Sequence, residues 1–111
     1  FIVLPQIETR TGLDNADAIA AHEITTAVAI GPYDLSTDLG VCFQMDHADM
    51  AAAIELIRRA GEKAGKTMWR IGDGARLARE GFHFLCIGEP TALLKGELAR
   101  LNQAAKDGKG D

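Results

Sequence analysis

Four apolar segments recur along the chain, and segments with helical periodicity separate them. The apolar segments are residues 1–8 (FIVLPQIE), 26–32 (TAVAIGP), 66–72 (KTMWRIG) and 82–88 (FHFLCIG). At least three of them are continuously apolar, which is typical of parallel strands that are covered on both faces. The pattern therefore predicts four buried parallel strands.

A helical pattern follows each predicted strand. Apolar residues recur at helical spacing in residues 12–22, 47–64, 73–80 and 90–105. In the second of these helices, Glu55 and Arg59 are spaced to pair on the exposed face. Gly81 stands where a helix normally stops, and Pro90 suits a first helical turn because its missing N–H is not needed there. The polar, Gly-rich residues 106–111 predict a flexible tail.

The predicted order is a βα unit repeated four times, with right-handed crossovers between the strands. Such a chain forms either an open doubly wound sheet or a segment of a (β/α)8 barrel. A whole barrel needs about 250 residues, and this chain has 111. No strand leads into a glycine-rich phosphate loop, so a nucleotide-binding open sheet has no positive support. Because the chain also begins inside an apolar strand without Met, we expect it to be a piece of a longer protein.

Composition narrows the class of protein. With 47% hydrophobic and 25% charged residues, the chain is an ordinary globular domain. Its net charge of -4 argues against a nucleic-acid partner and against an anionic membrane surface, because both attract a basic face. Cys42 and Cys86 form no CxxC pair, Cys86 is expected to be buried in its strand, and no disulfide between them is expected. We therefore expect a cytoplasmic protein with reduced thiols.

Two acidic residues mark the ends of consecutive strands. Glu8 ends the first strand and Asp34 follows the second. Neighbouring parallel strands lie about 4.8 Å apart, so acids at their ends are able to share one Mg²⁺ or Mn²⁺ ion. The alternatives are that Asp34 or Ser36 caps a short helical turn, and that Glu8 is a solvated strand end paired with Arg10.

The Gly31–Pro32 step between these acids has two interpretations. Glycine allows a ligand to approach the backbone closely, and proline stiffens the turn. The amides of Tyr33, Asp34 and Leu35 would then point toward a small anion such as a carboxylate. The alternative is a plain turn from strand to loop.

Several motifs, taken together, resemble those of a known family. The motifs are PQIET (residues 5–9), AIGPYDLSTDLG (29–40) and FLCIGEPTALLK (84–95). Over nearly its whole length the chain is similar to the class II pyruvate aldolases of the HpcH/HpaI aldolase/citrate lyase superfamily, of the 4-hydroxy-2-oxoheptanedioate aldolase type. Citrate lyase-like members usually lack the Gly-Pro-x-Asp-Leu form, which favours the aldolase branch.

This resemblance implies an α/β fold in which residues 1–105 form the C-terminal half, four βα units, of a (β/α)8 TIM barrel. It implies that Glu8 and Asp34 bind Mg²⁺, Mn²⁺ or another divalent metal. Gln6 would help to hold the keto acid, and the backbone at Tyr33 would contact the substrate carboxylate. The implied substrate-binding residues are Gln6, Gly31, Pro32, Tyr33 and Asp34. Many relatives carry a small residue in place of Tyr33, so the pocket is expected to be reshaped there.

The implied reaction is the cleavage of 4-hydroxy-2-oxo acids, of the diacid or sugar-acid type, to pyruvate and an aldehyde through a metal-stabilised enolate. An acyl-CoA carbon–carbon lyase of the same superfamily and a non-catalytic half-barrel fragment are the alternatives. The family's catalytic histidine and its substrate-clamping arginine lie in the first half of the barrel. None of His22, His47 and His83 matches that base, so we expect this chain to be inactive without its N-terminal half.

The remaining candidates concern the three histidines, the third strand and the last helix. His22 is expected to be exposed, His47 to cap a helix and His83 to lie inside the protein. Trp69 and Arg70 would line the aldehyde pocket, or would be a core tryptophan and a solvated arginine. The last helix carries an apolar stripe that suits either its own barrel or a neighbouring subunit, the latter in dimers that build hexamers as the resemblance implies. The stripe consists of Leu93, Leu94, Leu98 and Leu101.

Overall fold

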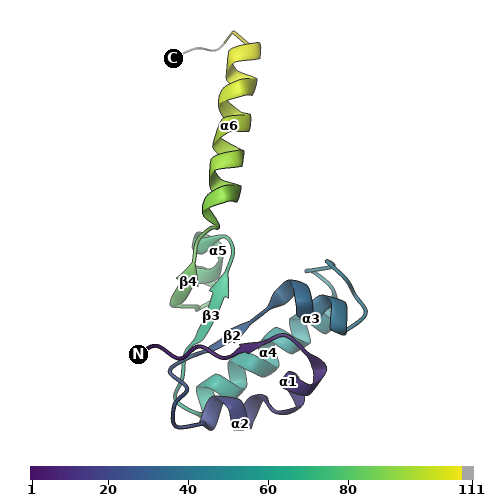
Figure 1. Ribbon diagram of the computed structural model, residues 1–111, viewed down its shortest axis with the longest axis vertical. Helices are drawn as coiled ribbons and strands as arrows, with labels where there is room; N and C mark the ends of the chain where they lie inside the picture. Colours follow the sequence, from purple (N-terminus) through teal and green to yellow (C-terminus); the bar gives the residue numbers. More distant parts are fainter. Residues whose placement is uncertain (109–111) are drawn as a thin grey trace.

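The structure, a computed structural model, describes residues 1–108 and contains one parallel sheet of four strands in the order β1-β2-β3-β4 (Figure 1). The strands are β1 (Gln6–Ile7), β2 (Val28–Ile30), β3 (Met68–Ile71) and β4 (Phe84–Cys86). Each lies inside one of the four apolar segments, so the predicted strands are confirmed. Strand β1 is short because Pro5 has no N–H to donate, although its carbonyl accepts from the Ala29 amide at 3.0 Å.

The helices follow the predicted βα order with two differences. They are α1 (Arg10–Asp14), α2 (Ala16–Ala21), α3 (Pro32–Asp38), α4 (Ala48–Lys63), α5 (Gly74–Arg79) and α6 (Pro90–Lys106). The predicted helix 12–22 is two helices that meet at Asn15, whose side-chain amide donates to the Thr11 carbonyl at 2.8 Å. A further helix, α3, begins directly after β2 with Pro32 in its first turn. Sequence periodicity missed α3 as an element because it has only seven residues.

Two local sequence signals are confirmed, one at the end of a helix and one on the exposed face of a helix. Gly81 follows α5 with φ of +88°, a left-handed conformation that favours glycine. The Nε of Arg59 donates to the Glu55 carboxylate at 2.6 Å, and Arg58 also binds Glu55. Helix α6 continues through Lys106, and residues 109–111 of the predicted tail lie outside the described residues.

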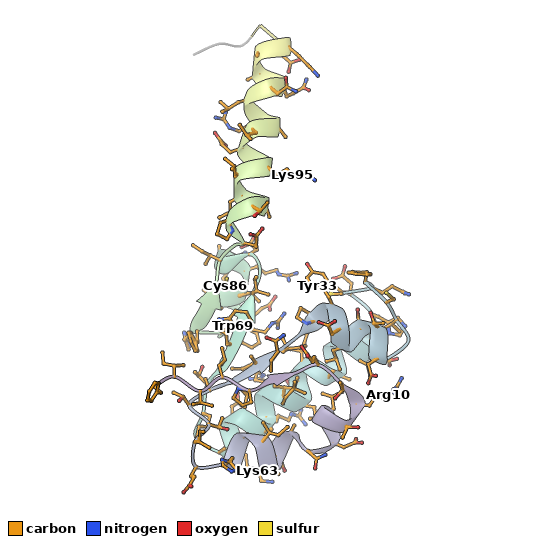
Figure 2. The ribbon with its side chains drawn as sticks, in the orientation of Figure 1. Arg10, Tyr33, Lys63, Trp69, Cys86 and Lys95 are labelled. Carbon is orange, nitrogen blue, oxygen red and sulfur yellow. The ribbon has the colours of Figure 1, made fainter. Side chains whose placement is uncertain are left out.

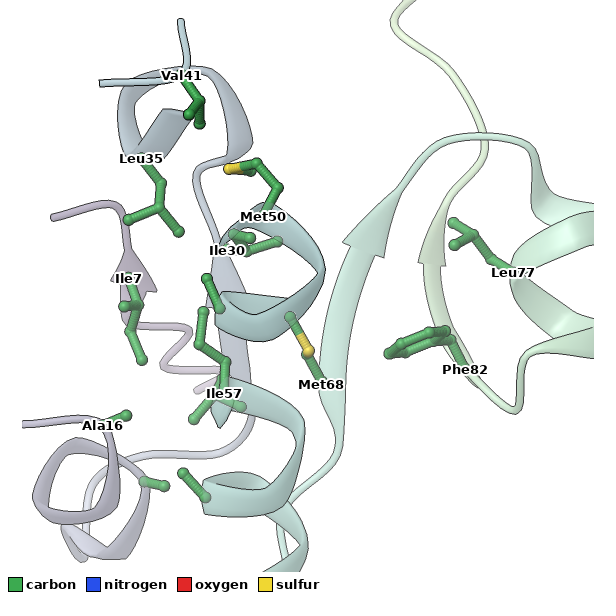
Figure 3. Close-up of a cluster of buried hydrophobic side chains, with 14 residues drawn as sticks. Ile7, Ala16, Ile30, Leu35, Val41, Met50, Ile57, Met68, Leu77 and Phe82 are labelled. Carbon is green, nitrogen blue, oxygen red and sulfur yellow. The ribbon is translucent and has the colours of Figure 1, made fainter. Parts of the chain in front are cut away.

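The hydrophobic core lies between the sheet and the helices α2, α3 and α4, and continues to Leu77 of α5 (Figure 3). Ile7 and Ile30 are opposite each other on the paired strands, and both are about 1% exposed. Ile57 from α4 is fully buried against them. Helix α4 approaches β2 closely at Gly61, where an added Cβ would lie 2.8 Å from the Lys66 carbonyl oxygen and 3.1 Å from the Val28 side chain.

Only β2 is buried at every residue, whereas most residues of β3 and all residues of β4 are half-buried. The expectation that the strands are covered on both faces is therefore wrong for β3 and β4. The pairing register places Gln6, Ala29, Trp69 and Phe84 in one row across the sheet. This row lies on the face opposite the core, which we call the open face. Cys86 is half-buried, not buried as predicted, and both cysteines are free thiols.

Helix α6 stands away from the rest of the molecule (Figure 1). None of its residues is buried. The radius of gyration is 17.2 Å, compared with about 13 Å for a compact domain of this length. No helix within residues 1–108 is both long enough and apolar enough to cross a membrane.

Ile57→Ala is expected to lower the free energy of unfolding by about 2–5 kcal/mol, because it leaves a cavity between α4 and the sheet. The neighbouring Leu56, which is 44% exposed, supplies the matched control. Leu56→Ala is expected to cost less than about 1 kcal/mol. Urea unfolding followed by circular dichroism measures both variants, and equal losses would contradict this account of the core.

Candidate active site at the strand ends

Gln6 and Glu8 come together at the end of β1. They are two residues apart on an extended segment, so their side chains leave the same face. The side-chain amide of Gln6 donates to Glu8 Oε2 at 2.9 Å. Glu8 is half-buried, and Thr9 then caps α1 by accepting from the Gly12 amide at 3.0 Å. The polar pair thus sits where β1 turns into the first helix.

Gly31, at the end of β2, makes room for this pair. A Cβ added at Gly31 would lie 2.5 Å from Glu8 Oε2 and 2.7 Å from Gln6 Nε2. Real Cβ atoms essentially never approach other atoms this closely, so any larger residue would displace Glu8 or Gln6. The Gly31 amide also donates to the Ile7 carbonyl at 3.0 Å and holds the two strand ends together. The need for glycine is therefore steric, since its φ of −95° is accessible to other residues.

Asp34 lies exposed in the first turn of α3, three residues after Gly31. Gly31 is the N-cap of this helix, so the alternative in which Asp34 caps it is wrong. Ser36 does not cap it either, because its buried hydroxyl donates to the Tyr33 carbonyl at 2.7 Å and accepts from the Phe43 amide at 3.0 Å. Helix α3 therefore has no side-chain cap from Asp34 or Ser36, and capping does not account for an acid at position 34.

Arg10 is not the partner of Glu8. Its guanidinium donates to the carbonyls of Asp38 and Leu39, at 3.0 and 2.8 Å. Its backbone amide donates to the Asp38 carboxylate at 2.6 Å. These contacts tie the start of α1 to the end of α3, so the predicted Glu8–Arg10 pair is wrong and Glu8 is contacted by Gln6 instead.

The backbone amides after Gly31 divide into two groups. The Leu35 amide donates to the Gly31 carbonyl at 2.9 Å and forms part of the helix. The interpretation that the Leu35 amide points toward an anion is therefore wrong. The Tyr33 and Asp34 amides belong to the first turn, where helical geometry provides no intrahelical acceptor.

The three histidines lie away from this cluster. His22 is the exposed C-cap of α2, and His47 is the N-cap of α4, where its Nδ1 accepts from the Asp49 amide at 3.2 Å. His83 precedes β4 and is exposed, so the prediction that it lies inside the protein is wrong. Its neighbour Phe82 takes the buried position instead. Hydrophobic neighbours along the chain suggested burial, but His83 precedes the strand, so its neighbours in sequence do not fix which way its side chain faces.

Trp69 and Arg70 face opposite sides of β3. Trp69 pairs with Ala29 and Phe84 and lies on the open face, on the strand beside the one that leads to Tyr33 (Figure 2). Arg70 pairs with Leu85, which packs against the core, and its guanidinium carbon is 4.9 Å from the centre of the Phe82 ring. Burial lowers the pKa of Arg70 below its ordinary value. Of these two residues, Trp69 is the one on the same face of the sheet as Gln6.

Among residues 1–108, no group of three or more His, Cys, Asp or Glu side chains lies close enough to hold a metal ion. Glu8 and Asp34 are therefore at most two protein ligands. Mg²⁺ in proteins is commonly held by one or two carboxylates, with water and substrate oxygens completing its shell. The two carboxylates fit such an ion in chemistry and in number.

Comparison with known proteins agrees with the motifs and the fold. The profile of the HpcH/HpaI aldolase/citrate lyase family matches residues 1–94. The chain belongs to this family. Among family proteins of known structure, an HpcH/HpaI aldolase from Desulfitobacterium hafniense superposes with a TM-score of 0.84 at 27% identity, covering 95% of this chain and 42% of that one. An HpcH/HpaI aldolase/citrate lyase family protein from Burkholderia cenocepacia superposes with a TM-score of 0.82 at 25% identity. The match covers 98% of this chain and 43% of that one.

Curated relatives are named as aldolases. A hydroxypyruvate/pyruvate aldolase from Deinococcus radiodurans is 40% identical over 109 residues, which are 95% of this chain and 39% of that protein. A 5-keto-4-deoxy-D-glucarate aldolase from Klebsiella pneumoniae is 32% identical over 108 residues, which are 94% of this chain and 42% of that protein. The chain thus spans about two fifths of the relatives it matches. Its four βα units correspond to part of a TIM-barrel-like aldolase domain.

Gly31→Ala tests the steric account of the site. The added methyl group is expected to push Glu8 and Gln6 aside and to destabilise the fold by about 1–3 kcal/mol. The side-chain amide resonances of Gln6 should shift at the same time. Gly96→Ala is the control, because nothing lies within 4 Å of a Cβ at that position. Unchanged Gln6 resonances in folded Gly31→Ala would contradict the close approach.

Proposed function

We propose that this chain supplies the metal-binding and keto-acid-binding part of a divalent-metal-dependent aldolase that acts on 4-hydroxy-2-oxo acids. The observation that carries the proposal is the cluster of Gln6 and Glu8 over Gly31, with Asp34 three residues after Gly31 in the first turn of α3. The names of the relatives, which include hydroxypyruvate/pyruvate and 5-keto-4-deoxy-D-glucarate aldolases, support the reaction class. Pyruvate and an aldehyde would be the products.

Glu8 and Asp34 would hold Mg²⁺, Mn²⁺ or a similar ion, because paired carboxylates favour hard cations. When bound, such an ion supplies Lewis-acid stabilisation for the negative charge that develops on the 2-oxo acid. In the chain alone, Gln6 orients Glu8 through its 2.9 Å hydrogen bond. The Gln6 amide has a second N–H that is able to donate to a keto or carboxylate oxygen of the substrate.

Gly31, Pro32 and Tyr33 would form the backbone wall against the substrate carboxylate. Glycine leaves this wall open, since a side chain there would occupy the space of Glu8 and Gln6. Pro32 fixes the backbone at the start of α3. Helix α3 in turn places Asp34 at its exposed first turn. The wall and one carboxylate are thus set by the same helix start.

The general base is not assigned to this chain. His22 and His47 are helix caps, and His83 lies at the opposite end of β4 from the strand tips. The chain spans about two fifths of its relatives, so residues outside it would supply the base and the substrate-clamping arginine. We therefore expect the chain by itself to bind ligands without turning over substrate.

Binding of Mn²⁺ with and without oxalate, which mimics the pyruvate enolate, tests the site directly. Oxalate is expected to tighten Mn²⁺ binding, measured by water-proton relaxation or electron paramagnetic resonance. Glu8→Gln and Asp34→Asn should each weaken this binding by at least roughly tenfold, about 1.4 kcal/mol. Glu23→Gln, which changes an exposed carboxylate elsewhere, is expected to have no effect.

The same titration should be repeated with the N-terminal half of the relative from D. radiodurans added. Oxalate-dependent binding that appears only then means that the missing strands complete the site. Absence of such binding in both preparations would contradict the proposal. Cleavage of an acyl-CoA substrate, without cleavage of a 4-hydroxy-2-oxo acid, by the completed protein would assign it instead to the lyase branch.

We also propose that α6 packs against a second copy of the chain in a dimer-based homo-oligomer. Leu93, Leu94, Leu98 and Leu101 are between 49% and 62% exposed on this helix, which has no buried residue. A contiguous apolar face of this kind is typical of an interaction surface. The stand-off of α6 from the core supports a partner outside the described chain, either a second copy or the rest of the barrel (Figure 1).

Leu94→Ser combined with Leu98→Ser is expected to shift the protein toward monomer in sedimentation velocity, because it removes two apolar contacts of the interface. Lys95→Ser is the control, since this exposed residue lies on the same helix between the two leucines (Figure 2). The same oligomeric state for the double variant and the original chain would contradict the proposed contact and favour packing within one barrel.

A further inference from the structure

Arg70 is a half-buried cation that forms no ion pair with a carboxylate among the described residues, although the charge of Glu80 acts on it. It lies on the helix side of β3 and stacks on Phe82 at 4.9 Å. No ion pair or hydrogen bond of its guanidinium is formed with any other residue in the described range 1–108. Arginine remains charged even where burial lowers its pKa. Partial removal from water makes an unpaired charge costly, so an anion that reached the Arg70 guanidinium would be bound favourably.

A cavity of about 200 Å³ lies beside Arg70, at the ends of β2 and β3. Its walls come from the start of α3, at Pro32 and Tyr33, from Met50 and Ile54 of α4, and from Gly72. The volume lies below the roughly 300–1,000 Å³ of sites for drug-sized ligands. It therefore suits a small ion or the end group of a larger molecule.

A second arginine lines the same cavity. Arg76 comes from α5, and its one ion pair among the described residues joins its Nε to Glu80 at 3.6 Å. Asp46 is the acid in the lining and is exposed. Glu80 compensates the charge of Arg76, so Arg70 is the guanidinium of the cavity lining that forms no ion pair among the described residues. An adjoining groove of about 490 Å³ shares both arginines and is also lined by Glu55, Arg58 and Glu80.

We propose that this cavity binds a small oxyanion, a phosphate or a carboxylate group, through Arg70 and Arg76. Planar guanidinium groups match the geometry of such oxyanions and bind them through paired N–H donors. The site is distinct from the Glu8 cluster, because Arg70 faces the helices whereas Gln6 lies in the row on the open face. Pro32 and Tyr33 form part of its wall, so the bound anion also braces the segment that carries Asp34.

Nuclear magnetic resonance titration of the 111-residue chain with inorganic phosphate, and separately with pyruvate, tests the proposal. Saturable shifts of the Arg70 Nε–Hε signal are expected. Arg70→Gln should weaken binding by roughly tenfold or more, as expected for loss of charged hydrogen bonds. Tighter binding of phosphate assigns the site to the free ion, and tighter binding of pyruvate assigns it to the carboxylate of a 2-oxo acid.

Control variants separate this site from the fold and from the proposed function. Arg76→Gln changes an exposed residue and should weaken binding even if Arg70→Gln disturbs folding. Arg79→Gln, on the same helix but outside the cavity lining, should bind normally. Glu8→Gln should retain phosphate binding, so failure of the Mn²⁺–oxalate test alone would not affect this proposal. Absence of saturable anion binding, or unchanged affinity in folded Arg70→Gln and Arg76→Gln, would overturn it.

Discussion

The contact between α4 and the β1–β2 pair is the interaction on which the rest of this structure depends. Ile57 from the helix is buried against Ile7 and Ile30 from the strands. Each fully buried side chain of this size contributes about 1.5–3 kcal/mol. Gly61 brings the helix close enough to β2 for this packing. The contact fixes the strand ends, and the strand ends position Glu8 and Gly31.

The opposite face of the sheet and helix α6 are both incompletely covered within residues 1–108. In the row across the open face, Gln6 is exposed and Trp69 and Phe84 are half-buried, whereas Ala29 is fully buried. In a complete barrel the corresponding face is the filled interior, and this chain corresponds to about two fifths of its relatives. Strands β1 and β4 are the edges of the described sheet. Helix α6 likewise lacks a partner within residues 1–108. The exposed apolar surfaces are thus those that a partial barrel leaves uncovered.

Much of the candidate site was accessible from sequence, because it depends on short motifs at strand ends. Glu8 and Asp34 follow apolar strands that pair in parallel, as the pattern predicted. The sequence predicted that another group approaches the Gly31 backbone closely, but it did not predict which residues do so. The atoms that crowd it belong to Gln6 and Glu8, more than twenty residues away in the chain. The Arg70 cavity was missed because five separate elements build it, β2, α3, α4, β3 and α5.

By itself, the sequence determined the order of strands and helices and the end of α5 at Gly81, because periodicity and turn chemistry act over a few neighbouring residues. Only the tertiary structure decided which partner each polar side chain takes and which side of the sheet it faces. Arg10 binds α3 instead of Glu8, and Arg70 turns away from the face that carries Trp69. These outcomes depend on strand register and on helix packing between distant segments, which local patterns do not encode.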